Sequence, residues 1–85
     1  MEIKLAIETV EQRLSSGARR DRLSVRRVSY RSAGDCGYDH PTFDGASILM
    51  VDLVRPWADG VLTVASATVA IRDGVVLSCS MPYWA

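Results

Sequence analysis

Apolar residues in the first fifteen positions recur at the spacing of an α-helix. The side chains that would share one face are Ile3, Ile7, Val10 and Leu14, while polar and charged residues fill the opposite face. We therefore expect an amphipathic helix over residues 2–15, stopped by Ser15-Ser16-Gly17 with Gly17 as its C-terminal cap. A strand is the alternative, because positions 3, 5 and 7 also alternate. The run from Glu8 to Leu14 does not fit a strand, so the helix is favoured.

Residues 22–32 change the parity of their apolar positions at Arg26-Arg27. Leu23 and Val25 fall on one parity, and Val28 and Tyr30 fall on the other. A β-bulge produces this change, so we expect an edge strand with a charged outer face. A second short helix is the alternative. Residues 33–45 are rich in Gly, Asp, Pro and Tyr, which predicts a long loop.

The second half of the chain reads as three strands. Residues 46–54 are almost entirely apolar and predict a central strand that ends at Arg55-Pro56, because proline cannot donate to a β-ladder. A turn over residues 57–60 leads into an uncharged strand over residues 61–71. Asp73-Gly74 is a preferred pair for a two-residue hairpin turn, and the last strand, residues 75–81, stops at Pro82.

Together these elements predict one compact α+β domain over residues 1–85. Its N-terminal helix packs on an antiparallel sheet of about four strands that ends in a β-hairpin. An apolar share of 48% with 24% charged residues is ordinary for a folded protein and argues against disorder.

The final hairpin lacks charge on both faces. In a hairpin with one face in solvent, apolar and polar residues normally alternate along each strand. One helix is about 10 Å across and covers only about half of one face of a four-stranded sheet. We therefore expect a face of small residues to pack against a second protein, with a second copy of the chain as the simplest candidate. This face is Thr63, Ala65, Ala67, Ser78 and Ser80. A strongly curled sheet that closes on itself is the alternative.

Charge is distributed unevenly along a chain whose net charge is zero. Residues 1–33 hold eight basic and four acidic side chains, and residues 34–85 hold two basic and six acidic ones. The simplest expectation is that the halves neutralise each other in the fold. The zero net charge argues against a general nucleic-acid or membrane binder. The basic candidates for contact with phosphate or with an acidic protein surface are Arg19, Arg20, Arg22, Arg26, Arg27 and Arg31.

Candidate chemistry is sparse. Cys36, Asp39, His40 and Asp44 bring reactive groups together, but they share one expected loop, whereas nucleophile–base sets are normally assembled from distant rigid elements. Cys36 and Cys79 match no zinc-ligand spacing. We therefore expect no catalytic residue, no metal and no cofactor. Asp39 and Asp44 fit a turn in which carboxylates bond to backbone amides.

The N-terminal residues lack the apolar core of a signal peptide, and no apolar run reaches the about 18 residues that a membrane helix needs. We expect a cytoplasmic protein with reduced cysteines. Trp57, Tyr83 and Trp84 sit in a turn and near the C-terminus. They fit either core plugs or an anchor for a partner, because aromatic residues are enriched at interface hot spots.

The order of one helix followed by antiparallel strands resembles the cystatin-like architecture. The segment Ala70-Ile71-Arg72-Asp73-Gly74-Val75-Val76, with Tyr83-Trp84 after it, resembles the closing hairpin of SnoaL-like cone-fold proteins. That resemblance covers about a quarter of the chain. It implies a ligand pocket lined by further helices, for which 85 residues leave little room, and the resemblance does not place the family's pocket acids and histidines in this sequence.

The sequence thus predicts a small non-enzymatic protein–protein interaction module. Its size suits an inhibitor or accessory factor of phage or mobile-element type that occludes a partner's surface through the apolar sheet face or the arginine-rich strand. Two alternatives stay open. One is a cone-fold small-ligand binder or enzyme that uses His40 with Asp39 or Asp44, and the other is a nucleic-acid-binding protein that uses residues 19–31.

Overall fold

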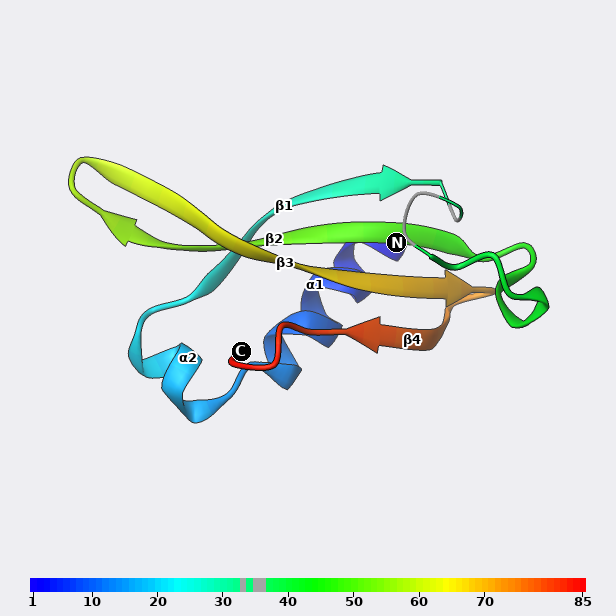
Figure 1. Cartoon of the computed structure of the whole chain (residues 1–85), viewed down its shortest axis with the longest axis horizontal. Helices are drawn as coiled ribbons and strands as arrows, with labels where there is room; N and C mark the ends of the chain where they lie inside the picture. The colour runs from blue at the N-terminus through cyan, green and yellow to red at the C-terminus, as the bar shows by residue number, and fades with distance from the viewer. Residues whose placement is uncertain (33, 35–36) are drawn as a thin grey trace.

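The chain forms an N-terminal helix packed on a four-stranded antiparallel sheet, in a computed structural model that describes residues 1–32, 34 and 37–85 (Figure 1). The sequence prediction of a small α+β domain of this architecture is confirmed. The strands lie side by side in chain order, β1-β2-β3-β4. The elements are α1 (Glu2–Arg13), α2 (Ser16–Arg20), β1 (Ser24–Arg31), the 3-10 turn η2 (Pro41–Phe43), β2 (Ser47–Trp57), β3 (Gly60–Arg72) and β4 (Val75–Ser80).

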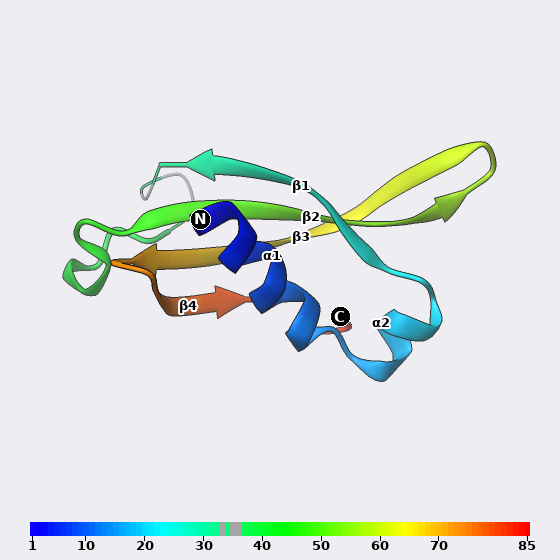
Figure 2. The same ribbon diagram turned by 180° about the vertical axis from the view of Figure 1, so that it is seen from behind.

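Helix α1 lies across one face of the sheet, which we call the inner face (Figure 2). Its small and β-branched stripe, Ala6 and Val10, is completely buried. This stripe packs against side chains of the two central strands: Leu49, Val51, Leu53, Ala67, Val69 and Ile71. The polar face of the helix remains in solvent, as expected for an amphipathic helix.

The inner face includes Ala65 and Ala67, two of the five residues that the sequence assigned to a contact with a second protein, so these two pack inside the chain instead. Ala67 has no exposed surface and Ala65 is half-buried, because α1 lies over this side of β3. Ser78 was placed on the wrong face. An extra residue at Leu77 shifts the register, so that Ser78 pairs with Ala70 on the outer face. A two-residue turn determines which face each side chain of the hairpin occupies only as far as the first bulge, because the extra residue there reverses the alternation.

The outer face is closed at one end by the segment that follows β1. Tyr38 packs there on Ile48 and Ala70, and its ring meets Phe43 edge to face with centroids 4.7 Å apart. Further along this face most side chains are polar, and the Ser66 hydroxyl donates to the Asp52 carboxylate at 3.0 Å. The central part of the outer face therefore resembles an ordinary solvated sheet surface.

Several local predictions are confirmed. The register of β1 shifts between Val25 and Arg27, which turns Val25, Val28 and Tyr30 toward the same face. The last hairpin turns at Asp73-Gly74, with φ angles of 52° and 75°. Glycine meets a positive φ without a steric penalty, and aspartate tolerates it better than most residues.

Two predicted boundaries were wrong. Gly17 does not cap α1, because the chain leaves that helix at an extended Leu14 and then forms α2, whose first turn is capped by the Ser15 hydroxyl. Pro56 does not end β2. Pro56 has no backbone N–H to donate toward the β1 side of β2. Because β1 pairs with β2 only as far as Val54, no strand lies there whose carbonyl would need that donor, and β2 can continue through Pro56. No helix in the described part of the chain is both long and apolar enough to cross a membrane.

The lengths of the elements determine which part of the sheet is left uncovered. The 12 residues of α1 span about 18 Å, whereas the 13 residues of β3 span about 40 Å, close to the 42 Å longest dimension of the molecule. The β2–β3 hairpin therefore projects past the helix, past the last β1 pair at Val54 and past the last β4 pair at Thr68. We call this projecting part, residues 55–63, the arm (Figure 1).

Substitution of Ala67 tests the assignment of the inner face. We expect Ala67→Leu to lower the free energy of unfolding by about 1–3 kcal/mol, because the added atoms must fit under α1. The control is Thr68→Leu at the neighbouring, half-buried position on the outer face. Urea denaturation of both variants provides the comparison. Equal stability of Ala67→Leu and the parent chain would contradict the packing of α1 on this face.

Candidate functional site

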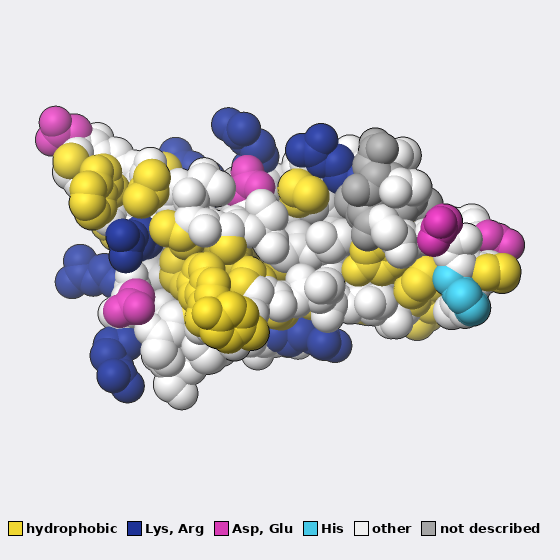
Figure 3. All heavy atoms as spheres, in the orientation of Figure 1, with side chains coloured by type: hydrophobic (Ala, Val, Ile, Leu, Met, Phe, Trp, Pro, Cys, Tyr) yellow, Lys and Arg dark blue, Asp and Glu magenta, His cyan; other side chains and the backbone are white. Residues whose placement is uncertain are grey.

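The arm exposes large apolar side chains that no other element covers. Trp57 is 59% exposed, Val61 is 49% exposed and Leu62 is 39% exposed. The Arg55 guanidinium lies over the Trp57 ring, 5.6 Å from its centroid, as in a cation–π pair. Figure 3 shows a hydrophobic patch on the arm and a second one beside the C-terminus.

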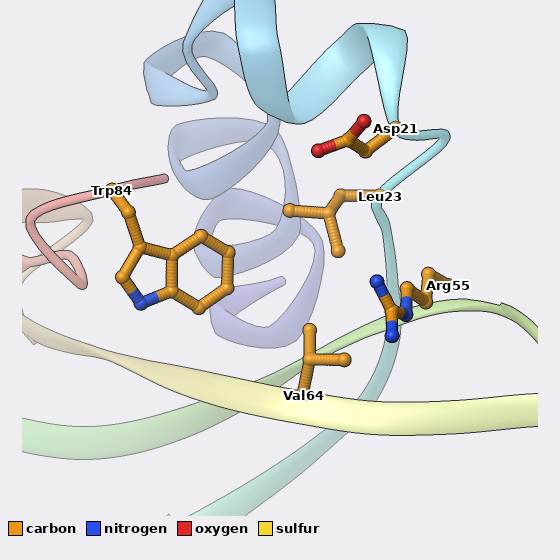
Figure 4. Close-up of a pocket in the computed structure, with 5 residues that line it drawn as sticks. All are labelled: Asp21, Leu23, Arg55, Val64 and Trp84. Atoms are coloured by element: carbon orange, nitrogen blue, oxygen red, sulfur yellow. The ribbon is translucent and has the colours of Figure 1, made fainter.

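A shallow groove of about 280 Å³ lies at the base of the arm on the inner side (Figure 4). Its residues come from three distant parts of the chain: Asp21 and Leu23 before β1, Arg55 and Val64 on the central strands, and Trp84 near the C-terminus. The side chains of Leu23, Val64 and Trp84 point toward one another, and Arg55 and Asp21 lie on the side opposite Trp84 (Figure 4). The groove is thus an apolar slot lined also by one positive and one negative group.

The C-terminal segment supplies one wall of the groove because it folds back toward α2. The backbone amide of Ser15 donates to the carbonyl of Ala85, and Ala85 itself is buried. This anchor leaves Tyr83 fully exposed and Trp84 43% exposed. The aromatic tail therefore does not plug the core; it presents ring surface next to the arm.

The arginines of residues 19–31 are exposed and lie in two places, around α2 and along β1. Arg19 has a structural task, because its guanidinium donates to the carbonyls of Leu14 and Glu11 at the end of α1. Among the described residues the single ion pair within 4.0 Å joins Lys4 and Glu8, so no direct ion pair joins the basic half of the chain to the acidic half. The guanidinium groups of Arg20, Arg22, Arg26, Arg27 and Arg31 are therefore left to solvent or to a partner.

The reactive side chains of the loop are not assembled into a catalytic set among the described residues. His40 is exposed, and its ring Nδ1 contacts the amide and hydroxyl of Thr42 at 3.1 and 2.8 Å, which caps η2. Asp39 and Asp44 are also exposed. Cys36 lies outside the described residues. No group of three His, Cys, Asp or Glu side chains in the described chain is placed to hold a metal ion.

Cys79 is half-buried on the inner face, beside Val69. Burial raises the pKa of its thiol, and the charge of Arg13 offsets this only in part. A thiol whose anion is disfavoured in this way is a poor nucleophile at neutral pH. Its position fits a packing role in the core.

No family model, no curated protein and no solved structure matches this chain. The candidate site therefore rests on the chain's own geometry. Of the sequence-predicted partner residues, the structure brings Trp57 and Trp84 to the same end of the molecule, where Arg55 lies over the Trp57 ring and lines the groove with Trp84, and it leaves Thr63 exposed on the arm. Arg26 and Arg27 lie at the β1 bulge, while Ala65, Ala67 and Ser78 take no part in this surface.

The groove residues Leu23, Arg55 and Val64 were missed from the sequence. One local signal was available, because Arg55 and Trp57 are two positions apart on a strand and so share a face. No local signal joins Leu23 to Trp84, which are 61 positions apart and meet only through the returning C-terminus.

Proposed function

We propose that this chain is a small non-enzymatic protein-interaction module that captures an acidic segment of a partner by an apolar side chain. The single observation that carries the proposal is the groove between Leu23, Val64 and Trp84 at the base of an arm that exposes Trp57. Tryptophan and arginine are the residues most enriched at interface hot spots. Both types meet here on one surface.

The size of the groove favours a partner's side chain over a small molecule. Pockets for small molecules are about 300–1,000 Å³ and enclose most of the ligand, whereas this groove of about 280 Å³ is open to solvent. One leucine or phenylalanine side chain from a partner fits such a slot. Its burial against Trp84 contributes about 1.5–3 kcal/mol.

Charge indicates the chemistry of the partner around that side chain. Arg55 and Asp21 line the groove, and the chain neighbours of Asp21 are the exposed Arg20 and Arg22. None of the three arginines has a carboxylate within 4.0 Å among the described residues. The excess of positive charge favours aspartate or glutamate beside the apolar anchor and accelerates encounter. The arm and Tyr83 then give a second and third contact, which suits a module that acts by covering a partner's surface.

Selection from a library of random displayed peptides tests this function. We expect enriched peptides to contain a bulky apolar residue flanked by Asp or Glu. Their affinity for the Arg55→Ala and Trp84→Ala variants should fall by about 10-fold or more, because each substitution removes a wall or the charge of the groove. Titration by fluorescence polarisation measures the loss.

The matched control is Val75→Ala, which truncates an exposed apolar residue at the opposite end of β3. Its affinity should equal that of the parent chain, and circular dichroism should show that all three variants keep the fold. Selected peptides that bind all variants equally would contradict a site at the groove.

The free arginines support a second candidate, a nucleic-acid contact along β1. Arg27 and Arg31 lie on the outer face of β1, and Arg26 sits at the bulge beside them. The described residues supply no ring for base stacking on this strand's outer face, so the contact would be to phosphates alone. Mixed-sequence DNA should then bind with an affinity that falls steeply with salt, and the Arg26→Ala/Arg27→Ala double variant should flatten that slope by about two counterions. A salt-independent signal in a mobility-shift titration would exclude this contact.

A further inference from the structure

One stretch of sheet edge on this molecule is long, uncharged and unpaired. β4 pairs with β3 only from Thr68 to Arg72, so the same edge of β3 is open over residues 60–67. Among the described residues, no backbone hydrogen bond other than those of the β2–β3 ladder reaches this stretch. An open edge of this kind is a template for another strand.

The other edges carry features that prevent strand addition. β1 presents Arg26, Arg27 and Arg31 together with its bulge. The open part of β2 contains Arg55 and Pro56, and β4 is six residues long with a bulge at Leu77. Charges, proline, bulges and short strands are the usual protections of a sheet edge. Residues 60–67 contain no charge and no proline, and their one irregularity is a bulge at Val64.

We propose that this open edge of β3 pairs in antiparallel register with the same edge of a second copy of the chain. A two-fold axis lays the stretch 60–67 against itself, so no like charges meet across this join, whereas an edge that carries several arginines places them close to those of its copy. The two short stretches on either side of Val64, residues 60–63 and 65–67, provide the ladder, and the exposed Val61 and Leu62 side chains pack across the join. The helices of both copies lie on the same side of the resulting continuous sheet.

This pairing uses the backbone edge of β3, whereas the function proposed above depends on the groove; the two surfaces adjoin at Val64 and share the arm. It also has a consequence for that function. The dimer would present two grooves on the same side of one sheet. A partner with two acidic segments would bind both grooves at once, and would gain avidity when the distance between its segments matches the distance between the grooves.

Sedimentation of the full chain from about 1 μM to about 1 mM tests the pairing. We expect a monomer–dimer equilibrium that Val61→Lys weakens by at least about 10-fold, because one lysine of each copy then lies in an otherwise uncharged join and loses water contacts there. Val61 is exposed in the single chain, so this variant should keep its fold. Val75→Lys, which charges an equally exposed valine at the other end of the sheet, should dimerise like the parent chain.

Hydrogen exchange gives a second readout, in which the amides of residues 60–67 gain protection as the protein concentration rises. A chain that stays monomeric up to about 1 mM would overturn self-pairing and leave the edge to a strand of another protein. A dimer that Val61→Lys and Val75→Lys affect equally would overturn the assignment to β3. Loss of peptide binding by groove variants changes neither outcome, so the two proposals fail separately.

Discussion

The packing of α1 against β2 and β3 is the interaction on which the rest of the structure depends. Ala6 and Val10 of the helix are completely buried against the central strands, and Ala67 beneath them leaves room for the helix to approach closely. A chain of 85 residues has little other core to rely on. The smaller cluster around Tyr38 on the outer face closes only one end of the sheet.

The limited reach of α1 determines the surface of the molecule. Because the helix is less than half as long as β3, the strands continue as an arm with exposed Trp57 and Leu62. The C-terminus returns to α2 and places Trp84 across from Leu23 and Val64, which makes the groove. The core and the candidate site therefore lie at opposite ends of β2 and β3. Helix α1 covers the core end, and the end with the candidate site is exposed. Substitutions at the open end should leave the packing of the core intact.

Local patterns were sufficient for most of the fold. Helical spacing located α1, the parity change located the bulge in β1, and Asp73-Gly74 located the last turn, because each of these depends on neighbouring residues alone. The assignment of faces failed because it depends on long-range facts. Helix α1 packs on the face of β3 that carries Ala65 and Ala67. The extra residue at Leu77 moves the residues of β4 that follow it to the opposite face from the one expected.

The candidate site was predictable only in part, for the same physical reason. For Trp57 and Trp84 the sequence left burial in the core and exposure as a partner anchor both open, and the structure shows that both side chains are exposed. The groove needs Leu23, Val64 and Trp84 together, and nothing in the linear order of the chain connects them. Pro56 was misjudged in a similar way, because its tolerance depends on where β1 stops.

The two tryptophans provide the most direct measurement, since they are the only ones in the chain and both lie at the proposed contact surface. In a ¹⁵N-correlated NMR spectrum each gives one indole N–H signal that is resolved from the backbone amides. Addition of an acidic peptide with one bulky apolar residue should shift the Trp84 signal most and the Trp57 signal as well, while the amide of Val75 stays in place. Shifts confined to Val75 and β4, with both indole signals unmoved, would contradict the account.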